Sequence, residues 1–595
     1  MTSQRPNKLN QFWQELRRRR VVRITTVYAA AAFVILELVS IITEPLKLPE
    51  WTLAFMIILL CVGFILAIIL SWIYDITPEG IEKTRSLQET REELPEKHSR
   101  ILAWKIATFI SVVVIIGLVI YNILGNTGRS GDIHGLEKSI AVLPFEILNS
   151  DEEYAWSGDA MTDEIILQLQ NIKEFRVISR TSTLRYKNAD KTIPQIGEEL
   201  GVNYLVEGTV QRQEDEIRIR VQVIRAKNEA HIWGNMYDNQ WEDIFDIQSD
   251  VAKQIAHELK AILSPEEIKK IEKNPTSNLE AYHLYLKGRW FWNKWTEENI
   301  KKGMEYFNKA IELDPDFALA YAGLAQAYTV LSFYSQLHPE KAFPKAKAMA
   351  LKALKIDNTI AEAHIASALV KVYYDWDWEG GENDFKKAIA LNPENITAHH
   401  LYAYFLVLLT RYDEAMVEIQ KALKLDPLNL ITNRTLGDFY YHMRQYDKAE
   451  EQLIRTLEMD STFTFTHAYL GLVYLQKSLC QKALDEMQKE IDLDLGNDFM
   501  ITAWKGYVYG ICGYKNEGSD ILNNLLERSE NEYIPPTAIS WIYFALGESD
   551  IGFDWLYKAY NERDHWITEI KSNHFFAGIH QDPRYKELLE RMKLY

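Results

Sequence analysis

The feature that most constrains this 595-residue chain is a repeat of 34 residues in its C-terminal half. Residues that would end a helix recur at that spacing, at Asn392, Asp426, Asp460 and Asp494. Small residues recur in phase with them, at Gly437 and Gly471, at Ala403, and at Ala415, Ala449 and Ala483. A fixed period with small residues at two positions predicts helical hairpins that cross closely and stack around one continuous core.

The phase of these positions resembles the tetratricopeptide repeat, in which prolines such as Pro393 and Pro427 stop one helix and open the next unit. The resemblance covers residues 284–568, as about eight units of which the last two are degenerate. A capping helix is expected over residues 569–595. The resemblance implies a right-handed superhelix whose concave groove binds peptides or protein partners.

The repeat phase also places individual side chains in that groove. On the first helix of the fourth and fifth units these are His400, Tyr404, Arg434, Asp438, Tyr441 and His442. They offer charge and aromatic surface suited to an extended polypeptide. The alternative is that each of them packs on the next repeat or stays solvated.

A different pattern occupies residues 136–263, between linkers at 125–135 and 264–283. Short apolar or alternating runs predict strands, and amphipathic runs predict helices, in the order β-α-β-α-β-β-α. The expected strands cover 139–145, 176–179, 204–213 and 216–225, and the expected helices cover 158–171, 192–200 and 247–263. This order predicts a small α/β domain.

The runs SIAVLPFE, GDAMTDEI, FRVISRTST and IGEELGVNYLVEGTVQR resemble the TolB amino-terminal-like domain. That module is joined to tetratricopeptide repeats in bacterial proteins. Some relatives place a class III nucleotide cyclase or a winged-helix domain ahead of it. The expected cytoplasmic pieces here, residues 1–20 and 75–105, are too short to fold as either. The resemblance therefore does not imply a cyclase in this chain.

Three apolar segments near the N-terminus predict transmembrane helices, because about 20 apolar residues cross a bilayer. They are residues 21–43, 52–74 and 106–124, within a membrane region over 21–124. Lys and Arg are frequent in the basic arm 1–20 and in loop 75–105, which places both in the cytoplasm. The expectation is a multi-pass bacterial inner-membrane protein with periplasmic C-terminal domains and the lipid bilayer as a partner. A cleaved signal peptide fits less well, since no small-residue cleavage site follows the first segment.

The residue types argue for binding rather than catalysis. A net charge of −18, from 66 basic and 84 acidic residues, argues against nucleic acid as a partner. The α/β region lacks a G-x-G-x-x-G turn and a P-loop, so no catalytic residue, cofactor or metal is predicted. Asp159, Asp163 and Glu164 cluster where a helix dipole favours acidic residues, and a metal site there is the minor alternative. Cys480 and Cys512 are predicted to be free thiols.

The predicted fold class is a multidomain chain of three transmembrane α-helices, a small α/β domain and an all-α repeat superhelix. The predicted function is a non-catalytic, membrane-anchored scaffold that presents the groove and the α/β domain to protein partners. The alternative is a periplasmic receptor that signals to a separate cytoplasmic cyclase or regulator.

Overall fold

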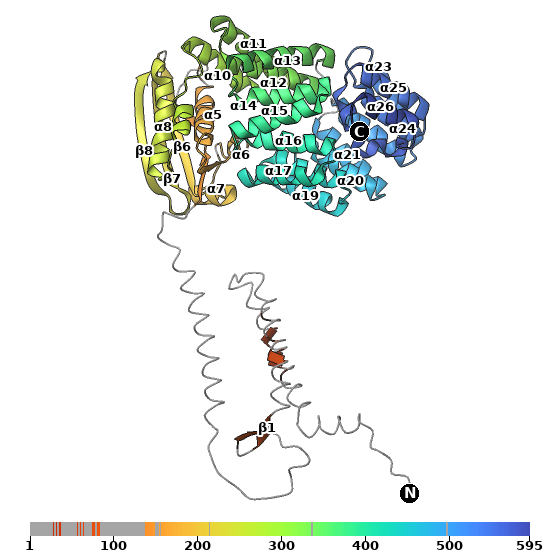
Figure 1. Ribbon diagram of the computed structural model, residues 1–595, viewed down its shortest axis with the longest axis horizontal. Helices are drawn as coiled ribbons and strands as arrows, with labels where there is room; N and C mark the ends of the chain where they lie inside the picture. Colours follow the sequence, from red (N-terminus) through yellow and green to blue (C-terminus); the bar gives the residue numbers. More distant parts are fainter. Residues whose placement is uncertain are drawn as a thin grey trace, which may run out of the picture. The chain divides into compact units, whose positions relative to one another are not determined.

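The structure is a computed structural model that describes residues 137–594, except for 149–153, 155, 188, 214, 335–336 and 495–497 (Figure 1). Before residue 137 it describes isolated positions between 28 and 64 and the hairpin of β1 (Tyr74–Thr77) and β2 (Gly80–Lys83). The chain divides into two compact units, Met1–His134 and Gly135–Tyr595. The second unit holds the α/β region and the repeats.

The structure corrects the expected membrane-spanning architecture. In the part of the chain that it describes, no helix is both long and apolar enough to cross a bilayer. The longest helix there, α13 (Pro339–Ile356), has 18 residues, contains Pro344 and buries only one face. The segments 21–43, 52–74 and 106–124 lie almost wholly outside the described residues. The fold class is therefore a mostly helical superhelix with a small α/β region, and a multi-pass inner-membrane location is not supported.

The α/β region is a mixed sheet in the order β5-β3-β6-β7-β8, with the short β4 paired to β6. The strands are β3 (Lys138–Val142), β4 (Glu146–Ile147), β5 (Phe175–Val177), β6 (Tyr204–Gln213), β7 (Glu216–Arg225) and β8 (Ala230–Gln240). Strands β5, β3 and β6 are parallel, and β6, β7 and β8 are antiparallel. The expected hairpin is present, whereas β8 extends the sheet beyond the strands that the sequence predicted.

Helices cover both faces of this sheet. Helices α5 (Ser157–Gln170) and α8 (Ile244–Glu258) share a core with alternate residues of β7, such as Ile219 and Val221. Helix α7 (Ile193–Leu200) covers one end of the other face. Its start is fixed by Thr192, whose backbone N–H donates to the Gln195 side chain, and its end by Gly201 at φ +62°.

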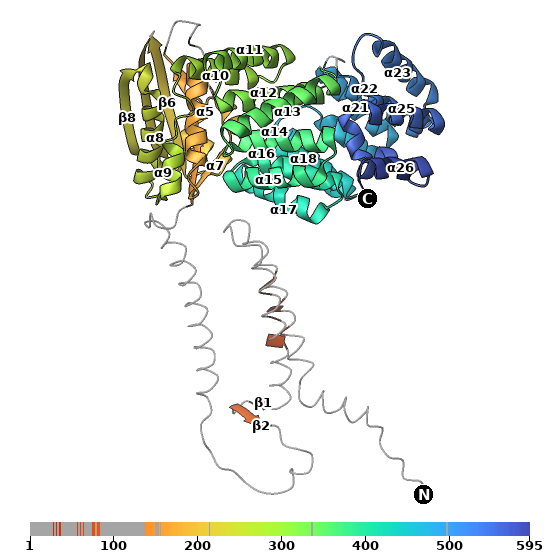
Figure 2. The ribbon, with the colours of Figure 1, turned by 45° about the horizontal axis from the view of Figure 1, so that its top comes forward.

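Sixteen helices of the repeat array follow in pairs, each pair a helix A and a helix B. The pairs are α10 (Leu279–Trp292) with α11 (Glu297–Leu313), α12 (Ala318–Phe333) with α13, α14 (Ala361–Val370) with α15 (Trp378–Leu391), α16 (Ile396–Leu408) with α17 (Tyr412–Leu425), α18 (Leu430–His442) with α19 (Tyr446–Met459), α20 (Thr466–Gln476) with α21 (Cys480–Asp494), α22 (Phe499–Ile511) with α23 (Lys515–Arg528) and α24 (Pro536–Leu546) with α25 (Ser549–Asn561). The α/β region lies at one end of the unit and α22–α26 at the other (Figure 2). Helix α26 is Pro583–Arg591.

The 34-residue period is visible in the backbone and in the packing. Trp376, Thr410, Arg444 and Ser478, each 34 residues from the next, have positive φ in the turn between helices A and B. A Cβ on Gly437 would lie 2.7 Å from Leu453 Cδ2, and one on Gly471 would lie 3.0 Å from the carbonyl oxygen of Ala483. The small residues therefore stand where helix A crosses helix B, as the sequence predicted.

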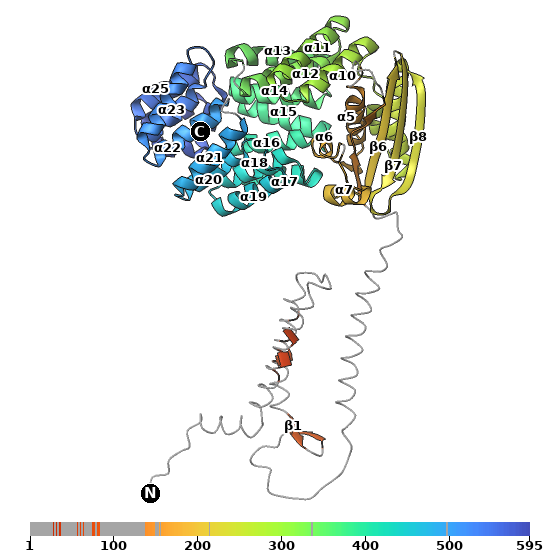
Figure 3. The same ribbon diagram turned by 180° about the vertical axis from the view of Figure 1, so that it is seen from behind.

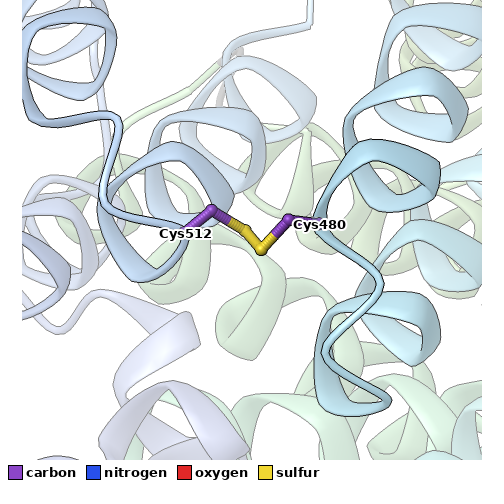
Figure 4. Close-up of a disulfide and its surroundings, with 2 residues drawn as sticks. All are labelled: Cys480 and Cys512. Atoms are coloured by element: carbon purple, nitrogen blue, oxygen red, sulfur yellow. A yellow bond between two sulfur atoms is a disulfide. The ribbon is translucent and has the colours of Figure 1, made fainter.

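Cys480 and Cys512 form a disulfide, which corrects the prediction of two free thiols (Figure 4). Free thiols are expected where neighbouring repeats are spaced too widely for the Cα separation that a disulfide needs. Cys480 begins α21 and Cys512 directly follows α22, and their Cα atoms are 5.9 Å apart. This distance lies within the range that a disulfide bridges.

Candidate functional site

The groove of the array is filled by the chain's own C-terminal segment, defined here as residues 564–580. It comprises the 3₁₀ helices η5 (His565–Lys571) and η6 (His574–Ile579), which follow the last repeat. It packs against α16, α24 and η4 (Lys371–Asp375), the π-helical end of the third helix A. The inner face of the superhelix is therefore in contact with a polypeptide in this structure.

The superhelix also closes on itself around this segment. His338, at the start of α13 in the second repeat, packs against Tyr533 with 4.5 Å between ring centroids. Trp376 of the third repeat packs against Tyr560 of the eighth at 4.9 Å, and the Trp378 indole N–H donates to the Met592 carbonyl. Repeats two and three thus meet the C-terminal end of the array, so the array closes around the segment; Figure 3 shows these helices from behind.

Four of the six predicted groove residues meet around the C-terminal segment. The Tyr404 hydroxyl donates to Glu569 Oε1 at 2.7 Å, and His442 Nδ1 donates to the Ser572 carbonyl at 3.0 Å. The Tyr441 carbonyl accepts from His574 Nε2 at 2.9 Å. Asp438 lies beneath them, with its Oδ1 3.3 Å from His442 Nε2. Asp438, Tyr441 and His442 are all buried.

This cluster is a buried arrangement of one imidazole between two carboxylates. Burial disfavours a charge on His442, but Asp438 and Glu569 outweigh it and raise the His442 pKa to about 9. Burial raises the Glu569 pKa, against the attraction of His442 and hydrogen bonds from Tyr404 and Asn573. A cationic His442, bonded to Asp438 and to the Ser572 carbonyl, therefore offsets part of the negative charge that the two carboxylates bring to the groove.

The other two predicted groove residues contact the following repeat instead. His400 Nε2 lies 3.0 Å from the Thr435 hydroxyl, and burial lowers the His400 pKa to about 4. Arg434 donates to the Thr464 carbonyl at 3.0 Å, and its guanidinium lies over the Phe463 and Phe465 rings. Arg434 stays partly exposed at the edge of the groove.

Sequence reasoning missed the residues that the C-terminal segment contributes. His565 is 4% exposed and lies between Phe333 and Tyr373, with ring centroids 4.9 and 6.3 Å away. Neither of its ring nitrogens has a hydrogen-bond partner, and burial lowers its pKa to about 3. The available signal was a stretch that lacks the 34-residue phase and is rich in His, Trp and Phe. The predicted boundary between the last repeat and the capping helix, at residue 568, falls inside it.

A second contact surface joins the α/β region to the turns between repeats. Ser179 and Ser182 donate to the carboxylate of Asp426, which is fully buried. Further along, basic side chains reach the C-terminal ends of successive B helices, where the helix dipole favours a positive charge. Arg185 donates to the Met459 carbonyl, Lys270 to that of Leu391, Arg176 to that of Leu425, and Lys273 pairs with Asp357.

The acidic cluster at the start of α5 belongs to this same interface. Asp163 Oδ1 pairs with Arg180 at 2.6 Å, and its Oδ2 accepts from the Asn293 amide at 2.6 Å. Asp159 accepts from the Trp290 indole N–H at 3.1 Å. Among the residues that the structure describes, no group of three or more His, Cys, Asp or Glu side chains is arranged to hold a metal ion. These carboxylates hold α5 to α10.

Comparison with known families separates the two regions. Residues 293–317 and 396–427 match the tetratricopeptide repeat family. These two stretches are tetratricopeptide repeats, and the array has the fold of a tetratricopeptide-like superhelix. Residues 136–255 match the family described as the HilA/YgeH-like transcriptional regulator, second domain. The expected TolB amino-terminal-like domain is not supported by this match.

Two curated relatives and one solved structure give the scale of the similarity. A putative adenylate cyclase 3 of Rhizobium meliloti is 31% identical over 234 residues, which is 39% of this chain and 40% of that protein. The transcriptional regulator HilA of Salmonella typhimurium is 22% identical over 143 residues, or 24% of this chain and 26% of HilA. The chain thus spans well under half the length of these relatives. The crystal structure of YrrB, a TPR protein with an unusual peptide-binding site, is 24% identical, with a TM-score of 0.23, and covers 32% of this chain and 93% of YrrB.

Proposed function

We propose that this protein is a non-catalytic interaction scaffold whose repeat groove binds an extended polypeptide segment of a partner protein. The observation that carries the proposal is the bonding of the groove to a polypeptide that is not a repeat. Tyr404 and His442 bind a carboxylate and a backbone carbonyl of that polypeptide, as side chains in a peptide-binding groove do.

The contact between the α/β region and the repeats supports the scaffold role. The α/β region contacts the turns that follow α13, α15, α17 and α19, so it braces four repeats along one edge. A braced superhelix keeps its groove at a fixed width, which lowers the entropy lost when a partner binds. The α/β region itself then offers a second surface through which two partners are held together.

The groove assignment predicts selection of peptides by the full chain. The Asn573 amide donates to the Glu569 carboxylate, so Asn573→Ala is expected to loosen the segment that fills the groove. Panning a random peptide library on the parent protein and on this variant should enrich sequences that contain a carboxylate and aromatic residues. Arg434→Ala, at the partly exposed edge of the groove, should weaken the binding of the selected peptides at least 10-fold in a titration. Arg455→Ala, on the exposed face of α19, is the matched control and should bind them like the parent. Failure of both proteins to enrich any sequence would remove the groove as a binding site.

Signalling is a second candidate function, and the names of the two relatives favour it. One is a putative adenylate cyclase and the other is a transcriptional regulator. We infer that the region shared with them serves as the input part of a signalling assembly, and that a separate protein provides the output. Co-purification of a cyclase or a regulator with the full chain would favour this reading over a simple scaffold.

The absence of catalysis in this proposal has a direct test. The purified full chain, incubated with ATP and either Mg²⁺ or Mn²⁺, is expected to form no cyclic AMP above a protein-free blank. A characterised cyclase assayed alongside verifies that the conditions support the reaction. Cyclic AMP formed in proportion to the concentration of this protein would show that the chain itself is an enzyme.

A further inference from the structure

We propose that the C-terminal segment is a built-in competitor for the groove, and that the partner presents a carboxylate followed by an aromatic side chain. The inference rests on the proposed function, because it names the chemistry and the regulation of the same groove. A partner polypeptide of this kind displaces residues 564–580 when it binds.

The segment lies outside the 34-residue period, yet groove side chains bond to it directly. The Tyr404 hydroxyl donates to the carboxylate of Glu569, and His442 donates to the backbone carbonyl of Ser572. Apolar side chains of the segment, such as Ile570 and Phe576, pack into the same core as the repeats. The Asn573 amide donates to the same carboxylate at 2.6 Å and so shapes the segment around it.

The groove surface that holds the segment defines the chemistry of a competing chain. The Tyr404 hydroxyl, 2.7 Å from Glu569 Oε1, and the charge of His442 favour an acidic side chain at the position of Glu569, against its burial and the repulsion from Asp438. Six residues later, Phe575 lies among Tyr507, Trp541 and Trp504, with ring centroids 4.3, 4.7 and 6.1 Å away. This aromatic pocket accepts one flat ring. An acidic residue followed by an aromatic one at about this spacing satisfies both contacts.

Several polar atoms around the segment have no partner while it occupies the groove. Both ring nitrogens of His565 lack one, and so do the indole N–H groups of Trp504, Trp541 and Trp566. Buried polar groups normally form hydrogen bonds, and leaving them unmatched opposes burial. Release of the segment lets His565 and Trp566 bond to water, and a partner that supplies acceptors to the indoles of Trp504 and Trp541 therefore gains an advantage over the segment.

The segment can leave the groove without unfolding α25 and α26, the two helices that flank it. It is a connection between α25 and α26, and these two helices contact each other directly. The Tyr557 hydroxyl of α25 donates to Glu587 of α26 at 2.8 Å, which anchors both ends of the connection. Release exposes Ile567, Ile570 and Phe576, all fully buried, so it requires a partner that covers the same apolar surface.

A labelled synthetic peptide with the sequence of residues 563–580 tests the inference by fluorescence anisotropy. The Asn573→Ala variant of the full chain has a weakened segment and should bind this peptide at least 10-fold more tightly than the parent. Asn561→Ala, an exposed position just before the segment, is the matched control and should behave as the parent does. A peptide with Gln in place of Glu569 should bind the variant at least 10-fold more weakly.

Hydrogen exchange on the unmodified parent provides the second measurement. Saturating peptide should accelerate exchange of the backbone amides of residues 564–580 while α16 and α18 stay protected. Peptide binding that leaves this exchange unchanged, with equal affinity for parent and variant, would overturn the competitor role and leave the proposed function standing. No binding of this peptide to either protein would also overturn the inference, whereas the library panning decides separately whether the groove binds peptides.

Discussion

Replacement of Asp426 by alanine is expected to lower the free energy of unfolding by about 3–5 kcal/mol and to loosen the α/β region from the repeats. Asp426 is fully buried and accepts hydrogen bonds from the Ser179 N–H at 3.2 Å, the Ser179 hydroxyl and the Ser182 hydroxyl at 2.7 Å. Burial raises the Asp426 pKa, while the two serines act in the opposite direction. Loss of the carboxylate leaves these donors buried and unmatched, at a cost of about 1–3 kcal/mol each.

The repeat supplies a matched control for this substitution. Asp460 lies 34 residues later, at the same position of the next repeat, and its carboxylate accepts from the Thr462 N–H just as that of Asp426 accepts from the Leu428 N–H. Asp460→Ala therefore loses only its local bonds from the Thr462 N–H and hydroxyl, with an expected effect of about 1 kcal/mol. Urea unfolding gives both free energies, and limited proteolysis should release the α/β region only in Asp426→Ala. Equal effects of the two substitutions would show that the contact with Ser179 and Ser182 contributes little.

This interface explains why the acidic and basic residues of the α/β region lie where they do. Asp163 faces Arg180 and Asn293, and Lys270 and Arg185 face helix ends of the array. These contacts run along the turns between repeats, whose spacing sets the pitch of the superhelix.

The sequence predicted the parts of this fold that repeat with a fixed period. The 34-residue spacing placed the crossing of α18 and α19 at Gly437, because a larger residue there would overlap Leu453. The alternation of apolar residues predicted β6 and β7, since one face of each is buried in the core. Strand β8 escaped prediction because it is an edge strand, mostly exposed on both faces, and so carries no clear alternation.

The sequence did not predict the contacts between parts of the chain that are far apart in sequence or that lie in neighbouring turns. The phase predicted Tyr404 and His442 as groove residues, but no periodic signal shows that residues 564–580 fold back onto them. The Cys480–Cys512 disulfide depends on the distance between two turns, which the repeat spacing alone does not give. The contact of Asp426 with Ser179 joins positions 247 residues apart, and only tertiary structure brings them together.

Acid is expected to destabilise the packing of the C-terminal segment in the groove, and His565→Phe should remove part of that destabilisation. His565 is buried and neutral, and burial lowers its pKa from 6.5 to about 3. An imidazole of this kind contributes stability above pH 6.5 and loses it as the pH falls toward 3, because only the released residue takes up a proton. At pH 5 the loss for this residue is about 2 kcal/mol, from 1.5 pH units at about 1.4 kcal/mol each.

The comparison of parent and variant isolates this titration from its neighbours. The aromatic rings of Phe333, Tyr373 and Trp566 surround His565, and the nearest charged group is Asp564, with its Oδ1 4.0 Å from Nδ1. Burial raises the Asp564 pKa to about 6, so Asp564 favours the folded state as the pH falls, and it does so in both proteins. Phenylalanine fits among the same rings and cannot be protonated.

The measured quantity is the difference in unfolding free energy between His565→Phe and the parent, followed by urea titration from pH 7 to pH 5. It should grow by about 2 kcal/mol in favour of the variant over this range. His257→Phe, at a histidine whose side chain is 80% exposed, should show no such growth. A constant difference between His565→Phe and the parent would mean that His565 is solvated or hydrogen-bonded in solution, and that the segment is held less tightly in the groove than its burial implies.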